Sequence, residues 1–429
     1  MKFENKKWLV RVALAGALCL GVASIAKADS RLDGMGANVQ EVDDVDAIWL
    51  YPNQLLQYKN TVDFRLNPIG LSLTSLITTE PTTTNGLGIN EWGGVIHDLG
   101  DDFGTIATYV NRPSALGNDQ GTLLTGAFKP LFGNYSTAVG GFNNKYTPSS
   151  NVDVFWAKSG FGLHLTYGDN EVNANGGGPA PIVSSQVWGL SAGFDLGSFM
   201  SFNTSEFHID YTEDYLTLNR VAGPESDNGV YTFKLGWLGQ STLNSNDNVR
   251  LFADLQYDNT SLPTGWSGSD LQQTSNDLEV LVGSSIKHNI SEKGFVNTGL
   301  EFEYDALNSS TNTAADSWNL VWNGSVESAL NSWLTLRAGL DKVIVNRTYT
   351  QGGPVAPTGT DTSLVGGLNN NVAFSTGLSA NVENWTLDTQ VSVSSLDTAI
   401  GTVAPGSGIF YGGNGQVFSV TQADLRYKF

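Results

Sequence analysis

Apolar and polar residues alternate along most of the chain. A predicted strand over 294–306 carries Val296, Thr298, Leu300, Phe302 and Tyr304 on one face, and Asn297, Gly299, Glu301, Glu303 and Asp305 on the other. A period of two is typical of a half-buried β-strand, and an amphipathic helix does not produce it. The pattern therefore predicts an all-β protein whose strands separate an apolar side from a polar side.

The same alternation predicts thirteen strands from residue 151 onward and three strands upstream. Their expected ranges are 61–69, 92–99, 103–111, 151–158, 160–168, 186–196, 199–211, 229–238, 248–258, 276–288, 294–305, 316–328, 332–345, 370–383, 385–396 and 416–429. The segment 112–150 has two interpretations, a further hairpin over 121–128 and 135–143 or a loop folded into a lumen. These give 18 or 16 strands, so we predict about 16, within a range of 14–18.

The connections between these strands alternate in length. Short ones are expected near 159, 197–198, 289–293, 329–331 and 383–384, and long ones at 169–185, 212–228, 259–275, 306–315, 346–369 and 397–415. Short periplasmic turns and long extracellular loops are typical of outer-membrane barrels. We therefore predict a transmembrane antiparallel β-barrel over 61–429, in the outer membrane of a Gram-negative bacterium.

Both ends of the chain carry patterns typical of export and membrane assembly. Residues 1–28 combine a basic stretch, an apolar run and Ala26-Lys27-Ala28, which predicts a secretory signal peptide cleaved after Ala28. At the other end, Leu425, Tyr427 and Phe429 form an outward apolar row that ends on an aromatic residue. This row resembles the C-terminal strand that the outer-membrane assembly machinery recognises. That machinery and the outer-membrane lipid are expected partners.

Charge and cysteine content narrow the function. The chain has 22 basic and 42 acidic residues, a net charge of −20, which excludes a basic surface for nucleic acid. Its only cysteine, Cys19, lies inside the predicted leader, so the mature chain offers no disulfide and no thiol nucleophile. Charged residues make up only 15% and glycine is abundant, as expected for a turn-rich β protein.

The segment 29–60 does not alternate, and we predict that it forms a short plug before the first strand. It resembles the N-terminal region of FadL-type outer-membrane proteins at Gly34, Gly36, Asp43, Asp44, Pro52 and Asn53. The order Pro52-Asn53 departs from the family's Asn-Pro. The resemblance implies an N-terminal hatch and a hydrophobic cargo. Asp43, Asp44 and Asp46 have two open interpretations, an acidic turn that caps a short helix and a latch bonded to the lumen wall.

Acidic residues gather on the inward face of three consecutive predicted strands. They are Asp254, Asp258, Asp277, Glu279, Glu301, Glu303 and Asp305. A hairpin turn near 291 would set Glu279 opposite Glu303 and Asp277 opposite Asp305. A solvated polar wall accounts for such residues, and two functional interpretations stand beside it.

The first functional interpretation is a divalent-cation site, with Ca²⁺ as the cation, because hard cations bind several carboxylate oxygens. Its ligands would be Asp277, Glu279, Glu303 and Asp305. The second is a charged lumen that selects solutes. Its residues would be Asp254, Glu279, Glu301, Glu303, Arg250, Lys234 and Arg337.

These patterns predict an outer-membrane channel for the passive transport of small solutes, monomeric or homotrimeric, with no required cofactor. A porin-like aqueous pore and a FadL-like conduit are both open, and an adhesin or structural surface barrel is the alternative. An enzyme is not expected, because the four histidines show no metal-ligand spacing and no Ser/His constellation is legible. They are His97, His164, His208 and His288.

Overall fold

The computed structural model describes most of the predicted strands and part of the predicted plug. Besides Leu32, Met35 and Ala37, the described residues are 40–66, 92–112, 151–173, 182–219, 226–262, 273–309, 314–351, 360–365, 372–392 and 419–429. The leader expected over 1–28 and the hairpin or loop expected within 113–150 lie outside them. Among the described residues, no helix is long and apolar enough to cross a bilayer.

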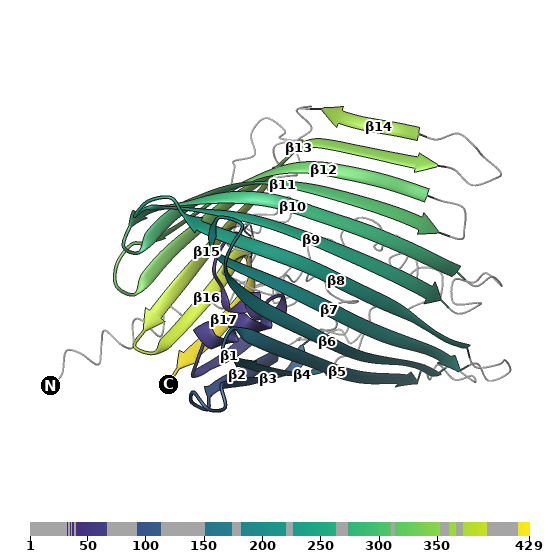
Figure 1. Cartoon of the computed structure of the whole chain (residues 1–429), viewed down its shortest axis with the longest axis horizontal. Helices are drawn as coiled ribbons and strands as arrows, with labels where there is room; N and C mark the ends of the chain where they lie inside the picture. The colour runs from purple at the N-terminus through teal and green to yellow at the C-terminus, as the bar shows by residue number, and fades with distance from the viewer. Residues whose placement is uncertain are drawn as a thin grey trace, which may run out of the picture.

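The strands form one antiparallel sheet that closes on itself (Figure 1). They are β1 (Thr61–Leu66), β2 (Trp92–Asp98), β3 (Thr105–Arg112), β4 (Asn151–Lys158), β5 (Phe161–Asn173), β6 (Ile182–Phe199), β7 (Phe202–Asn219), β8 (Ser226–Thr242), β9 (Asp247–Leu262), β10 (Gln273–Ser291), β11 (Gly294–Ser309), β12 (Ala314–Ala329), β13 (Leu334–Gln351), β14 (Thr360–Val365), β15 (Val372–Val382), β16 (Trp385–Ser392) and β17 (Ser419–Lys428). Consecutive strands pair along the chain, except that β14 and β15 both pair with β13, and β1 also pairs with β17, which closes the barrel.

The described strands fill sixteen positions around the barrel. β14 and β15 pair with successive parts of β13 on the same side, β14 with 345–350 and β15 with 334–342, so together they occupy one position. β3 pairs directly with β4, which leaves no place between them for a hairpin from 112–150. The prediction of about 16 strands is therefore confirmed, and the alternative of 18 is wrong.

Several predicted strand ends and turns were wrong. β6, β7, β10 and β13 run for 18 or 19 residues, well beyond their predicted ranges, and β14 lies inside a predicted loop. The hydrogen-bonded ladder continues past the apolar alternation, because outward side chains no longer need to be apolar where the strand leaves the lipid. The β6–β7 turn lies at Met200 and Ser201, both with positive φ, rather than at 197–198.

Side-chain exposure shows which face of the sheet points outward. On β11, Val296, Leu300 and Phe302 are 41%, 45% and 39% exposed, whereas Asn297 and Glu301 between them are buried. The outward face carries apolar side chains and the inward face carries polar ones, as the alternation predicts. This is the arrangement that a bilayer requires of a closed barrel, since lipid contacts the outside.

The N-terminal segment lies inside the barrel, toward the end that carries the short turns. It forms two 3₁₀ turns, η1 (Val45–Trp49) and η2 (Pro52–Gln57). Trp49 meets Trp92, Tyr109 and Phe155 edge-on, with ring centroids 5.8, 5.1 and 4.7 Å away. This aromatic cluster fills the lumen beside β2, β3 and β4 with apolar side chains. We call residues 40–58 the plug.

Candidate functional site: the plugged lumen

Buried ion pairs join the plug to β1 and β17, the two strands whose pairing closes the barrel. We call this junction the seam. The guanidinium of Arg65 on β1 binds both carboxylate oxygens of Asp46, with Nη1 2.7 Å from Oδ2, and its Nε lies 3.2 Å from Asp63. Its positive charge also lies over the Trp92 ring, 4.4 Å from the centroid. Arg426 on β17 reaches Asp44 at 3.4 Å. Such pairs hold only when the geometry compensates for desolvation, so they place the plug in one position.

A second group of contacts joins the start of the plug to the opposite wall. Gln40 donates to Asp254 on β9, and Arg250 on the same strand binds Asp43. Arg250 also donates to the backbone carbonyl of Gln40 at 3.3 Å. On β12, Asn323 donates to Glu41. The plug is thus bonded to strands on both sides of the lumen and crosses between them.

The middle of the plug rests against the wall formed by β5, β6 and β7. Asn53 and Gln54 donate to the Glu206 carboxylate at 2.8 and 3.0 Å. A Cβ at Gly193 would lie 2.8 Å from Pro52 Cδ, and one at Gly162 would overlap the backbone of the same turn. Two glycines in the wall therefore make room for the plug backbone.

The acidic residues of the plug have both of the roles that their pattern suggested. Asp44 is the N-cap of η1, and its carboxylate accepts a hydrogen bond from the backbone N–H of Asp46 at 3.3 Å. Asp43, Asp44 and Asp46 also contact Arg250, Arg426 and Arg65, respectively. Capping and wall contact are compatible because the short helix presents its first turn to the arginines.

Histidines take part in the same interior network. His208 lies between Asp210 at 2.5 Å and Asp254 at 3.1 Å, and the Tyr51 ring meets it edge-on at 4.9 Å. Burial raises the pKa of Tyr51 well above its ordinary value, so the phenol is neutral beside these charges. His164 contacts Asp153 at 2.8 Å. Both histidines therefore lie on the inward face of the barrel.

The two remaining histidines lie near the rim that carries the short turns. His97 stacks on Phe429 with ring centroids 6.0 Å apart, and His288 contacts Asp247 at 2.6 Å.

The other lumen residues singled out in the sequence lie on the inward face. Arg337 binds Glu327 at 2.6 Å and Asp388 at 2.7 Å. Asn323 and Asn319 donate to Glu301 and Glu303, respectively, each at 3.3 Å. Lys234 pairs in register with Asp210 on one side and Gln256 on the other. These charges are spread around the wall rather than gathered in one ring.

The predicted register of the acidic hairpin was wrong by two residues. Glu279 faces Asp305, not Glu303, and Asp277 faces Leu307. The turn lies after Ser291, which pairs with Gly294, and a bulge between Asn289 and Ser291 shifts the register back by one residue, so that Asn289 pairs with Phe295. As a result, Asp277, Glu279 and Asp305 bring carboxylate oxygens within 4.8 Å of one another, and Glu303 does not belong to this group.

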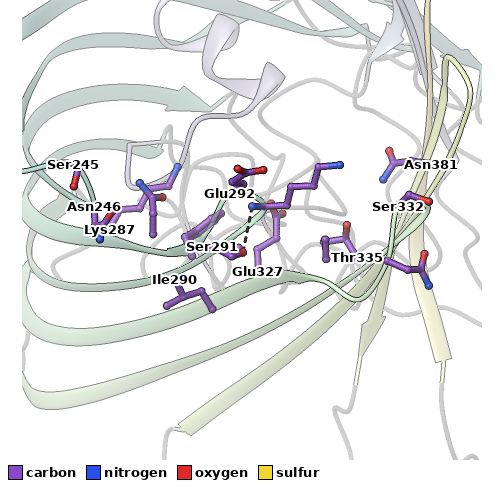
Figure 2. Close-up of a pocket in the computed structure, with 16 residues that line it drawn as sticks. Ser245, Asn246, Lys287, Ile290, Ser291, Glu292, Glu327, Ser332, Thr335 and Asn381 are labelled. Atoms are coloured by element: carbon purple, nitrogen blue, oxygen red, sulfur yellow. Dashed lines mark hydrogen bonds between the residues drawn. The ribbon is translucent and has the colours of Figure 1, made fainter.

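A cavity of about 920 Å³ opens beside the plug at the short-turn end. Figure 2 shows its lining, which comes from the ends of β10, β11, β12, β13 and β15 and from the turns at this end of the barrel. Polar residues dominate this lining, among them Lys287, Glu327, Thr335 and Asn381. Phe295 also lines it and packs against the N-terminal cluster of Leu32, Met35 and Val42. We call this space the vestibule.

Sequence patterns did not identify several residues that hold the plug. Arg65, Glu206, Gly162 and Gly193 have no motif around them, and their roles follow from meeting the plug at one height in the lumen. The one available signal was an inward-facing arginine on the short first strand.

A closed sixteen-position antiparallel sheet, apolar outside and polar inside, defines a transmembrane β-barrel of the outer-membrane type. No protein-family model matches the chain, and no curated protein matches it significantly.

The comparison with solved structures finds matches at low similarity, among them the three that follow. The CymD monoaromatic hydrocarbon channel matches at 10% identity and a TM-score of 0.38, over 95% of this chain and 99% of that one. The Pseudomonas putida toluene transporter TodX matches at 11% sequence identity and a TM-score of 0.36, over 95% of this chain and 98% of that one.

The FrpB iron transporter of Neisseria meningitidis (F3-3 variant) matches at 10% sequence identity and a TM-score of 0.37, over 57% of this chain and 44% of that one. The match thus spans less than half the length of FrpB. At these identities and TM-scores the similarities do not assign the chain to a family.

Proposed function

We propose that this protein is a passive outer-membrane channel for small polar solutes, narrowed by its own N-terminal plug. The polar vestibule beside the plug carries the proposal, because a space of about 920 Å³ is large enough for a small solute. Lys, Glu, Asn, Ser and Thr side chains in its lining offer hydrogen bonds to a hydrated molecule. A hydrocarbon would gain little there, so the proposal departs from the hydrophobic cargo that the FadL resemblance implies.

The mechanism needs only diffusion past charged walls. From the vestibule, a solute diffuses past the plug along the polar inner wall of the barrel. Arg337 and the inward carboxylates of β11 then bias the passage of charged solutes electrostatically. The selectivity roles of Asp254, Glu279, Glu301, Glu303, Arg250, Lys234 and Arg337 belong to this proposal.

Planar-bilayer recording and liposome swelling test the proposal. The full chain should give small conductance steps and admit only the smallest sugars. A variant that lacks residues 40–58 should conduct more and admit larger sugars, because the plug occupies the lumen. Folding of both forms is checked by the heat-dependent gel shift of intact barrels. If both forms are folded and neither conducts nor admits any sugar, the protein is not a channel.

A further inference from the structure

We infer that Asp277, Glu279 and Asp305 form a calcium site on the lumen wall toward the long-loop end. Asp277 and Glu279 are two residues apart on β10, so they share its inward face, and Asp305 faces Glu279 from β11. One carboxylate oxygen from each lies within 4.8 Å of the others. The inference goes beyond the proposed function and does not depend on it.

A second observation independently points to a ligand at this place. Asp277 is 1% exposed, and the side chain that its carboxylate meets is another acid, Asp305; no other side-chain donor among the described residues reaches it. Glu279 Oε2 and Asp305 Oδ1 also lack a donor within the described part of the chain. Buried carboxylates normally accept several hydrogen bonds, and a bound cation would satisfy the oxygens of all three acids at once.

The neighbouring strand supplies a further oxygen and fixes its orientation. Gln256 on β9 pairs in register with Glu279 and is 1% exposed. Its amide nitrogen donates to Asp258 at 2.6 Å, while Thr232 donates to the other oxygen of Asp258 at 2.5 Å. Asp258 is thereby satisfied, and the Gln256 carbonyl Oε1 is left without a donor among the described residues. Three adjacent strands thus present free acceptor oxygens at this place, and the positive charge of Lys234 on β8, in register with Gln256, also acts on Glu279.

The coordination geometry favours Ca²⁺ over Mg²⁺. Ligand oxygens around Ca²⁺ lie at 2.3–2.6 Å in a flexible arrangement, so three oxygens within 4.8 Å of one another can share one ion. Mg²⁺ needs near-ideal octahedral geometry at about 2.1 Å and keeps several waters, which three carboxylates fixed on one wall suit less well. Bound Ca²⁺ would tie β9, β10 and β11 together and leave this part of the wall with a charge of about −1.

Calorimetric titration of CaCl₂ into the refolded full chain tests the site. The preparation must be free of lipopolysaccharide, whose phosphates also bind calcium. We expect one Ca²⁺ per barrel with a Kd of about 10⁻⁴–10⁻³ M, and at least tenfold weaker binding of Mg²⁺. Asp277→Asn, Glu279→Gln and Asp305→Asn should each weaken Ca²⁺ binding at least tenfold. Glu303→Gln is the matched control, because Glu303 lies on the same strand and the same face as Asp305. It should change the affinity for Ca²⁺ less than twofold.

Stability in a chelator separates a lost ligand from a lost fold. With EDTA present, the three neutral variants should melt at or above the wild-type temperature, because each removes like-charge repulsion. Added calcium should raise the melting temperature of the wild type and of Glu303→Gln, and leave the three variants unmoved. Absence of calcium binding by the wild type overturns the inference. So does unchanged binding by the three variants, or an equal loss in Glu303→Gln, and equal Mg²⁺ affinity overturns the calcium assignment.

Discussion

The contact between Pro52 and Gly193 permits a steric test of how firmly the plug is held. In Gly193→Ala the new Cβ would meet Asn53 Oδ1 most closely, and it would lie 2.8 Å from Pro52 Cδ and 2.9 Å from Pro52 N. Ordinary contacts are at least 3.4 Å, so Pro52 must retreat by about 0.6 Å or the strand must yield. The retreat would also lengthen the bonds from Asn53 and Gln54 to Glu206. Adding Gly162→Ala extends the overlap to the backbone of the same turn.

Overpacking of this kind costs about 1–3 kcal/mol. Because the strands themselves accept alanine, the cost falls on docking of the plug and raises the undocked population roughly 5- to 150-fold. Amide hydrogen exchange in η1 and η2 measures that population directly, since exchange proceeds through the open form. The amides of Tyr51 and Gln54, which donate to Ala47 and Tyr51, are suitable probes.

The matched control is Gly324→Ala on β12, whose Cβ would meet only Trp322 ring atoms at 3.3 and 3.4 Å. Its exchange rates in η1 and η2 should equal those of the wild type. Equal exchange in wild type, Gly193→Ala and the double variant would show that Pro52 does not fill the space against the wall.

Two further predictions concern the seam and the chain end. Asp46→Ala should lower the free energy of unfolding in urea by about 3 kcal/mol, the low end for a broken buried pair because Asp63 still contacts Arg65. Asp43→Ala should cost less than about 1 kcal/mol, since Asp43 is half exposed and Arg250 keeps the Gln40 carbonyl; equal losses would contradict this account. Phe429→Ala should reduce folded barrel in the outer membrane far more than Phe103→Ala, an exposed aromatic at the same rim, as scored by heat-modifiable protein in outer-membrane fractions. Similar losses would mean that the terminal row is no assembly signal.

The sequence was most informative where a single physical rule acts along a whole strand. Contact with lipid forces alternation, so the sixteen strands and their inward faces were predictable, as Val296 and Asn297 illustrate. Beyond the bilayer that rule ends, and the extensions of β6 and β13 and the short β14 were missed. A period of two tells which face a residue lies on, but not which residues of different strands lie at the same level along the barrel axis.

In the candidate sites, too, the sequence predicted which side chains face inward but not which of them lie next to one another. Parity placed Glu279 and Asp305 inside, but the position of the hairpin turn after Ser291, together with a bulge near Asn289, decided which residue each one faces. The absence of alternation before residue 61 predicted a plug. Its partners on distant strands, such as Glu206, depend on packing in three dimensions and carry no local signal.

The seam of the barrel has a consequence for folding kinetics. β1 joins β17 through the pairs from Thr61–Lys428 to Leu66–Ala423, so closure links residues more than 350 positions apart. Such a non-local contact forms slowly, and until it forms both edge strands have unpaired backbone groups. Arg65 and Arg426 on these two strands each bind an aspartate of the plug. The plug thus holds the first and the last strand at the same time, so the closure of the sheet and the docking of the plug depend on shared contacts.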